Sequence, residues 1–344
     1  MTTPSLPGAI ALDAMGTDLG PLPLVAGAAQ AVRGGIPVVL VGDERVLGPL
    51  VPAGVDLPIR HASEVVGMAE APAVAVRRKP DSSVNRAVEM VATGQACAVV
   101  SCGNTGGAMA AALFQLGRID GVERPALTTI APRADGGQLV LLDLGANADC
   151  RPQHLVQFAL MGAVFARAAL GLEHPRIGLL SNGEEMGKGN ELVRMTGPLL
   201  AETDLDFVGN VEPTGAFGGQ CDVLVTDGFT GNVMLKTVEA TAQVVTNLLR
   251  AEARGAVSRA VGARLLAPLL RRFRERTDAR AVGGALLLGV KGLVVVGHGR
   301  SDARAVASAL RHAAGLVESG LGGRTDGAIQ RAIAGALPVE PPAR

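Results

Sequence analysis

The chain has 344 residues, 48% of them hydrophobic, and its 32 Lys and Arg balance its 32 Asp and Glu. This composition is that of a folded domain and excludes a disordered chain, and zero net charge with no Trp or Tyr argues against a general nucleic-acid binder. No apolar run reaches the ~20 residues of a membrane span, and residues 1–8 lack the features of a secretory signal. The four cysteines form no C-x-x-C pair. We therefore expect a cytoplasmic protein.

Apolar, β-branched runs alternate with helical patterns along the chain, which is typical of parallel β-α units. Strands are predicted over residues 9–13, 36–41, 96–100, 127–131, 139–144, 176–180, 207–211 and 223–226. Helices are predicted over residues 23–33, 83–93, 108–116, 153–170, 191–201, 232–254 and 303–317. Residues 282–296 are rich in Gly and Leu and end in a further apolar strand. We therefore predict an α/β fold with a mostly parallel sheet and helices on both faces.

Residues 101–107, Ser-Cys-Gly-Asn-Thr-Gly-Gly, join a predicted strand to a predicted helix and are the first candidate for a ligand site. Small residues here leave backbone N–H groups free at the positive end of the helix dipole, an arrangement that binds phosphate. We expect Ser101, Asn104, Thr105 and Gly106 to bind phosphate. Taken alone, the segment also fits an ordinary capped turn, and it lacks the spacing of a P-loop or a dinucleotide fingerprint.

Polar, glycine-containing segments follow six of the predicted strands. Open parallel sheets bind ligands beyond the carboxyl ends of their strands, so we expect these segments to converge on one crevice. The segments are residues 13–16, 101–107, 143–147, 181–185, 227–232 and 298–301. The residues expected to bind substrate there are Asp13, Gly16, Asn182, Asp227, Asn232 and Lys236.

The sequence marks no covalent nucleophile. Cys102 has no evident His partner and no Ser lies in a G-x-S-x-G elbow, so we expect direct attack by a bound small molecule, with Cys102 a small buried residue. No metal-ligand spacing occurs among the strand-end Asp and Asn residues, and we expect neither a metal nor another cofactor. Three of the four lysines lie in or beside glycine-rich segments, where an ammonium suits phosphate oxygens or a developing oxyanion. His298, between two glycines, is a candidate donor or general acid, and a loop histidine bonded to backbone is the alternative.

Eight segments, taken together and in order, resemble the bacterial phosphate acyltransferase (PlsX) family. They are Asp13-Ala-Met-Gly, Gly103-Asn-Thr-Gly, Arg124-Pro-Ala-Leu, Asp143-Leu-Gly-Ala-Asn147, Gly183-Glu-Glu-Met-Gly-Lys188, Gly209-Asn-Val-Glu212, Asp227-Gly-Phe-Thr-Gly-Asn-Val233 and Gly297-His-Gly299. The resemblance spans about residues 9–317 and implies a fold similar to the phosphate acetyltransferases and the isocitrate/isopropylmalate dehydrogenases, and a homodimer. Thr17 and Leu19 replace a Gly and a His of the family pattern, so a His there is not the base, and Leu286 replaces a Pro.

The resemblance also implies an activity. The family transfers a fatty acyl group from acyl-(acyl carrier protein) to inorganic phosphate, giving acyl phosphate for phospholipid synthesis. Its partners would be acyl carrier protein, inorganic phosphate and a downstream glycerol-3-phosphate acyltransferase. We expect Lys188 and Asn147 to steady the phosphate or the oxyanion, with His298 near the leaving thiolate.

Residues 250–276 hold eight arginines against two acids, and apolar residues recur there at helical spacing. With the preceding helix this pattern predicts a helical hairpin over residues 232–276, within a single two-lobed unit of residues 1–331 that is followed by a loose tail over 332–344. A basic amphipathic helix suits an anionic membrane surface or an acidic carrier protein, and dimer packing is the alternative. The contact residues expected on the hairpin are Leu265, Leu269, Arg271, Arg272 and Phe273.

Three rival functions remain open from the sequence. A phosphate acetyl- or butyryltransferase would use coenzyme A thioesters. A metal- and NAD-dependent decarboxylating dehydrogenase would need a cluster of metal-binding aspartates, which the sequence lacks. A non-enzymatic scaffold would position lipid enzymes at a membrane through the basic hairpin, but the glycine-rich loops argue against scaffolding alone.

Overall fold

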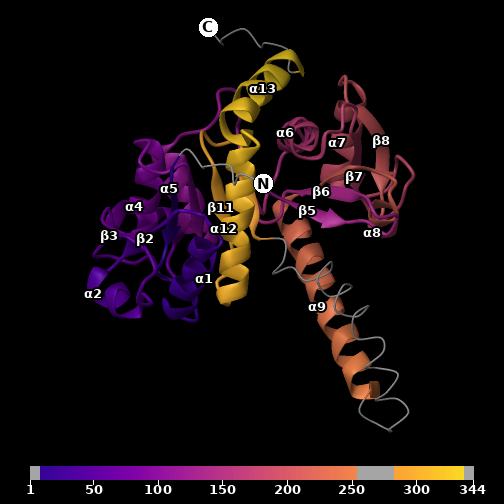
Figure 1. Cartoon of the computed structure of the whole chain (residues 1–344). Helices are drawn as coiled ribbons and strands as arrows, with labels where there is room; N and C mark the ends of the chain where they lie inside the picture. The colour runs from indigo at the N-terminus through magenta and orange to yellow at the C-terminus, as the bar shows by residue number, and fades with distance from the viewer. Residues whose placement is uncertain (1–7, 254–282, 337–344) are drawn as a thin grey trace, which may run out of the picture.

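The structure of the chain is a computed structural model that describes residues 8–253 and 283–336. The described residues form one 11-stranded sheet with helices packed against it (Figure 1). In spatial order the strands are β3 (Ile59–His61), β2 (Val38–Gly42), β1 (Ile10–Asp13), β4 (Ala98–Ser101), β11 (Val294–Val296), β10 (Ala285–Leu288), β5 (Ala126–Pro132), β6 (Gln138–Leu142), β9 (Val223–Val225), β7 (Arg176–Leu180) and β8 (Asp206–Val211). The helices are α1 (Leu22–Arg33), α2 (Glu44–Leu47), the 3-10 helix η1 (Gly48–Leu50), α3 (Pro72–Arg78), α4 (Ser83–Ala92), α5 (Thr105–Gln115), α6 (Pro152–Leu170), α7 (Glu191–Ala201), α8 (Pro213–Gly218), α9 (Gly228–Ala253), α12 (Ala303–Glu318) and α13 (Leu321–Ala336).

Strand direction reverses in the middle of the sheet. β3, β2, β1, β4 and β11 are parallel to one another, and so are β6, β9, β7 and β8. Between the two sets, β10 is antiparallel to β11 and to β5, and β5 is antiparallel to β6. The two parallel sets therefore run in opposite directions, and their carboxyl ends lie at opposite edges of the sheet. The expected mostly parallel sheet is confirmed, but the premise that all six strand-end loops meet at one edge is wrong.

Helices cover both faces of the sheet, as predicted. Ile10 and Leu12 of β1 join a buried cluster that includes residues of α1, α6 and α12, whereas Ala11 joins a second cluster with residues of α4 and α5. This alternation is the period-2 side-chain pattern of a strand covered on both sides. Phe158 and Phe165 of α6 are among the largest fully buried side chains, and truncating such a residue to Ala costs about 3–5 kcal/mol.

Several predicted boundaries differ from those of the structure. α5 begins at Thr105 rather than at residue 108, because the Asn104 side chain caps it by accepting a hydrogen bond from the Gly107 N–H at 3.0 Å. α13 runs through the start of the expected tail, because residues 332–336 are helical. Ile333 is buried in the hydrophobic core, which fixes this part of the helix. The tail prediction is therefore wrong for these residues, and residues 337–344 lie outside the described part of the chain.

The first half of the predicted hairpin is a single long helix. α9 has 26 residues and extends away from the sheet (Figure 1). The remainder of the predicted hairpin, with all five of its expected contact residues, lies outside the described residues. No helix within residues 8–253 and 283–336 has the length and hydropathy needed to cross a bilayer.

Candidate active site

The loop after β4 (residues 102–104, with the first turn of α5) has free backbone donors. Asn104 is the N-cap of the 11-residue α5, and its side chain satisfies the N–H of Gly107. Among the described residues, no hydrogen bond uses the N–H groups of Thr105 and Gly106, which are the first two of the helix. Two unpaired N–H groups at the positive end of a helix can bind one anionic oxygen each.

The Asn104 side chain itself is already occupied. Its Nδ2 donates to the carbonyl oxygens of Gly67 at 3.1 Å, Met68 at 3.3 Å and Glu70 at 3.3 Å. With Oδ1 on Gly107, the amide uses both of its ends within the protein. Asn104 therefore shapes the loop, and the donors left for an anion are the backbone of Thr105 and Gly106.

Ser101 also turns away from the free donors. Its hydroxyl donates to Asp13 Oδ2 at 2.7 Å, and both side chains are buried. Burial raises the pKa of Asp13, while hydrogen bonds from Ser83, Ser101 and the Met15 N–H act in the opposite direction. Ser101 and Asp13 therefore stabilise the base of the loop through a buried hydrogen bond. We had expected both side chains to contact the ligand directly.

Cys102 is the small buried residue that the sequence predicted. The side chain is fully buried, and burial raises the pKa of its thiol to about 12. The thiolate that a nucleophile requires is therefore disfavoured at neutral pH. All four cysteines are free thiols.

The loops after β1 and β11 lie beside the loop after β4. The N–H of Asp18 donates to the carbonyl of Gly299 at 3.0 Å, and the N–H of Gly297 donates to the carbonyl of Ser101 at 2.8 Å. His298 is exposed in this group, with its Nδ1 accepting from the N–H of Arg300 at 3.4 Å. We call these three neighbouring loops, residues 13–18, 101–107 and 298–301, the glycine-loop group.

A second group forms around the buried Asp143, at the end of β6. Its carboxylate accepts hydrogen bonds from the N–H groups of Leu127 at 2.9 Å and Ala146 at 3.0 Å, and from the Asn147 N–H at 2.7 Å and Nδ2 at 2.8 Å. Burial raises the pKa of Asp143, and these donors oppose the rise. Asn147 Nδ2 also donates to the Pro125 carbonyl at 2.7 Å, so this side chain, expected to contact phosphate, is buried and holds the loop.

The start of α9 packs directly on the Asp143 loop. Gly228 donates its N–H to the Asn147 carbonyl at 2.8 Å, and a Cβ at Gly228 would lie 2.6 Å from that oxygen. The Asp227 carboxylate accepts from both the N–H and the hydroxyl of Thr230, each at 2.8 Å. Asn232 lies next to Gly145, with its Cβ 3.6 Å from where a Cβ on that glycine would be. The structure therefore brings Asp227 and Asn232 together with Asn147.

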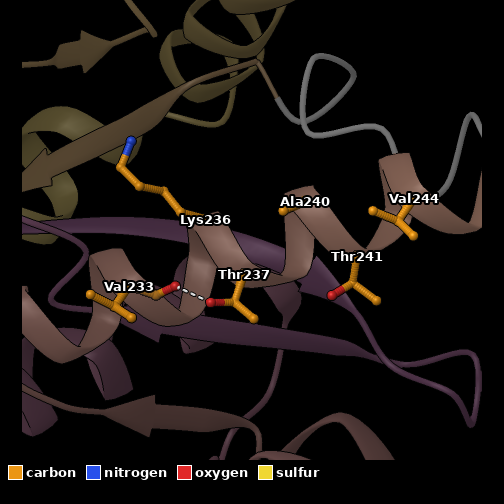
Figure 2. A pocket seen from close by; sticks show the side chains of 6 residues that line it. All are labelled: Val233, Lys236, Thr237, Ala240, Thr241 and Val244. Atoms are coloured by element: carbon orange, nitrogen blue, oxygen red, sulfur yellow. Dashed lines mark hydrogen bonds between the residues drawn. The ribbon is translucent and has the colours of Figure 1, made fainter.

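Lys236 follows on α9, where it lines a pocket of about 480 Å³. Figure 2 shows its side chain with those of the other described lining residues: Val233, Thr237, Ala240, Thr241 and Val244. The Thr237 hydroxyl donates to the Val233 carbonyl at 2.8 Å and is therefore used within the helix, and the Lys236 side chain points away from Thr237 and Thr241 (Figure 2).

The loop after β7 carries Asn182 and Lys188, both exposed. Asn182 Oδ1 accepts from the Gly189 N–H at 3.0 Å, and the Lys188 N–H donates to the Glu185 carbonyl at 2.9 Å. The ion pairs found among the described residues do not include Lys188. Within residues 8–253 and 283–336, its ammonium therefore has no ion-pair partner.

The structure therefore divides the expected site residues between two groups. Asp13, Gly16 and His298 lie with the loop after β4, whereas Asn147, Asn182, Lys188, Asp227, Asn232 and Lys236 lie with strands of the opposite direction. No hydrogen bond or ion pair found among the described residues joins the two groups. Residues 8–253 and 283–336 contain no group of three or more His, Cys, Asp or Glu that could hold a metal ion.

Sequence reasoning missed the segment over residues 65–72. This segment supplies the carbonyl oxygens that accept hydrogen bonds from Asn104. Lys79 in turn donates to Val65 and Glu70 within the segment. Lys79, one of only four lysines, was its one visible signal.

Comparison with solved structures defines the class of the fold. The chain is similar to a phosphotransacetylase from Streptococcus pyogenes, with a TM-score of 0.55 and 18% identity over 90% of this chain and 94% of that one. It is similar to a 4-hydroxythreonine-4-phosphate dehydrogenase from Klebsiella pneumoniae, with a TM-score of 0.54 and 14% identity over 90% and 99% of the two chains. At these identities the likeness shows the fold alone, and it confirms the predicted fold class.

Sequence comparison then identifies the family. A family model described as a fatty acid synthesis protein matches residues 9–324. The phosphate acyltransferase of Desulforudis audaxviator is 48% identical over 321 residues, which cover 93% of this chain and 96% of the relative. That of Myxococcus xanthus is 47% identical over 341 residues, 96% of each chain. The chain belongs to the phosphate acyltransferase family, as the sequence motifs had indicated.

Proposed function

We propose that this phosphate acyltransferase transfers a fatty acyl group from acyl-(acyl carrier protein) to inorganic phosphate, giving acyl phosphate for phospholipid synthesis. The observation that carries the phosphate site is the pair of free N–H groups of Thr105 and Gly106 at the start of α5. Bound there, phosphate is already an anionic nucleophile at neutral pH, so the enzyme has to position it rather than to activate it.

In the proposed reaction, a phosphate oxygen attacks the thioester carbonyl carbon, and the tetrahedral intermediate then expels the carrier thiolate. One C–O bond forms and one C–S bond breaks, without a change of oxidation state. The Lys188 ammonium would stabilise the developing oxyanion, Asn147 would hold the Asp143 loop, and His298 would lie near the leaving thiolate. Lys188 lies in the loop after β7 and His298 in the loop after β11, so this assignment requires a substrate that reaches both loop groups.

Acyl phosphate formation tests the proposal. Purified protein is incubated with acyl-carrier protein and phosphate, without metal or NAD, beside a reaction with acetyl- or butyryl-CoA. We expect acyl phosphate and free carrier in equal amounts with the long-chain carrier donor. Product from short CoA thioesters alone would favour the phosphate acetyl- or butyryltransferase alternative, and no product from any donor would favour the scaffold.

Two variants test the residue roles within an active enzyme. Asn104→Ala should raise the KM for phosphate because it releases the loop that holds the free donors. Lys188→Ala should lower kcat more than it changes either KM, because oxyanion stabilisation acts in the transition state. Unchanged phosphate KM and kcat in both variants would remove the assignment.

The pocket on α9 suits the acyl chain of the substrate. Its described lining is mainly apolar along one side of the helix, and Lys236 adds a cation that an acyl phosphate could pair with (Figure 2). We therefore assign Lys236 and this pocket to acyl binding.

The proposal includes a homodimer and a peripheral association with the membrane, next to a downstream glycerol-3-phosphate acyltransferase. Phe229 and Leu248 of α9 are 66% and 60% exposed, and exposed apolar side chains grouped on one element mark interaction surfaces. Sedimentation analysis of Leu248→Asp tests the dimer, which should dissociate. Flotation with anionic liposomes after Leu269→Asp and Phe273→Asp tests the membrane association, and unchanged flotation would exclude this contact.

A further inference from the structure

Residues 65–72, here called the cover segment, lie against all three loops of the glycine-loop group. Each loop has a glycine where the cover segment approaches, so that a side chain would collide with it. A Cβ at Gly16 would lie 2.9 Å from the Val66 carbonyl oxygen, one at Gly106 2.6 Å from Pro72 Cγ, and one at Gly299 2.6 Å from Met68 Cε. These glycines make room for a protein segment, in addition to any role in ligand approach.

The cover segment is attached to the start of α5 through Asn104. The three carbonyl oxygens that Asn104 Nδ2 contacts belong to Gly67, Met68 and Glu70. Unpaired, these oxygens would place negative partial charge beside an anion site, and the amide neutralises that effect by donating to them. The position of the cover segment therefore decides both the shape and the local charge around the free N–H groups of Thr105 and Gly106.

Lys79 and Glu70 close the cover segment on itself. Glu70 Oε1 accepts from the Gly67 N–H at 2.7 Å and from Lys79 Nζ at 2.6 Å, and Lys79 Nζ also donates to the Val65 carbonyl at 2.7 Å. The two side chains are 31% and 39% exposed. A solvent-accessible ion pair contributes little to the stability of a whole protein. The effect of this partly exposed pair is local, because it fixes the turn between Val65 and Glu70.

We propose that Lys79 and Glu70 are a positioning pair for the phosphate substrate, which holds the cover segment in the place where it completes the site at the start of α5. The inference rests on the proposed function. Lys79 is not a phosphate ligand in this scheme, because its ammonium is held by Glu70 and Val65. A direct ligand role for Lys79 is the competing explanation, and the two differ in what they require of Glu70.

The test compares Lys79→Met, Glu70→Gln and the double variant in the acyl phosphate assay. If the pair positions the cover segment, each single variant raises the phosphate KM by about tenfold, kcat and the acyl-donor KM stay within about twofold, and the double variant is no worse than either single one. Lys79→Arg should restore most of the phosphate affinity. Lys291→Met, which removes an exposed ion pair with Asp120 elsewhere, is the matched control and should behave as wild type.

Other outcomes overturn the inference. If Lys79→Met raises the phosphate KM and Glu70→Gln leaves it unchanged or lowers it, Lys79 contacts phosphate directly. If both variants match wild type, or if both change the two KM values equally, the pair does not position the phosphate site. Failure of the proposed function is a separate result, because wild-type protein would then form no acyl phosphate at all.

Discussion

Ser101 Oγ donates a hydrogen bond of 2.7 Å to Asp13 Oδ2, and this buried contact joins the carboxyl ends of two adjacent strands. Asp13 of β1 and Ser101 of β4 are register partners in the parallel ladder. The contact extends the ladder by one side-chain hydrogen bond, at the point where the backbone leaves the sheet to form the loop before α5. The loop that carries the free donors therefore rests on a buried carboxylate.

We expect Ser101→Ala to lower the free energy of unfolding by about 1–3 kcal/mol, because it leaves the buried Asp13 carboxyl short of a donor. Urea denaturation measures the change. Thr93→Ala is the control, since it removes an exposed hydroxyl that bonds to the carbonyl of Glu89 in its own helix, and it should cost less than about 0.5 kcal/mol. Equal losses in the two variants would contradict a special role for the Ser101–Asp13 contact.

Two substitutions at Asn104 should separate its two contacts. Asn104→Ala removes the cap of Gly107 and should cost about 1 kcal/mol of stability. Asn104→Asp keeps an oxygen for that cap but places a carboxylate against the carbonyls of Gly67 and Glu70, next to the proposed phosphate site. Of the two variants, we therefore expect Asn104→Asp to be the more stable. We expect both to have a higher phosphate KM than wild type, with the larger increase in Asn104→Asp. Thermal unfolding and steady-state kinetics check the two orders, and the same order in both measurements would contradict the separation.

The titration of Asp326 on α13 should make stability depend on pH. Burial raises its pKa to about 6 from the ordinary value of 3.8, although the Gly292 N–H and Lys291 oppose the rise. The folded state thus prefers the protonated carboxyl, and this stabilisation is complete below pH 3.8 and is lost as the pH rises through about 6. Because the group is only partly buried, solvent screening reduces the expected loss to about 1–2 kcal/mol.

Asp326→Asn stays neutral at every pH and should lack this loss. The measurement is the difference in unfolding free energy between wild type and Asp326→Asn, from urea titrations at pH 4.5 and pH 7.5. The stability of wild type relative to Asp326→Asn should fall between pH 4.5 and pH 7.5. A difference that does not depend on pH would show that Asp326 is not shifted.

Local signals predicted several elements to the residue. β7 and α7 have the bounds that the sequence indicated, 176–180 and 191–201. α7 is clear because Asn190 accepts from the N–H of Val193 at 2.9 Å and Glu191 begins the first turn, both of which are local features of sequence. For α7, neighbours in the chain were sufficient, whereas the equally local cap of α5 by Asn104 was not recognised.

The arrangement of the site could not be predicted in the same way. Strand direction across β10 and β5 is a property of the whole sheet, and no residue near Lys188 or Asn147 signals that their strands run opposite to β4. The amide of Asn104 bonds to Met68, 36 residues earlier in the chain, in a segment with no regular pattern. The partners of the residues expected at the site are set by tertiary contacts of this kind, which local sequence does not show.

The pocket on α9 gives the last prediction. Ala240 lies in the middle of the described lining, between Thr237 and Val244. In Ala240→Trp the indole would fill much of a pocket of about 480 Å³. Long acyl chains should therefore no longer fit in the pocket, whereas short chains should still bind. We expect the rate with long-chain acyl-carrier donors to fall by about tenfold and the rate with a butyryl donor to stay within about twofold.

Val238→Trp is the matched control, because Val238 is exposed on the same helix but does not line the pocket. It should leave the chain-length profile of wild type unchanged, which separates pocket filling from a general effect of an added indole on α9. Loss of activity in Ala240→Trp that is equal for long and short donors would show that the pocket does not hold the acyl chain. A profile shifted towards short chains only in Ala240→Trp would place the acyl chain along α9.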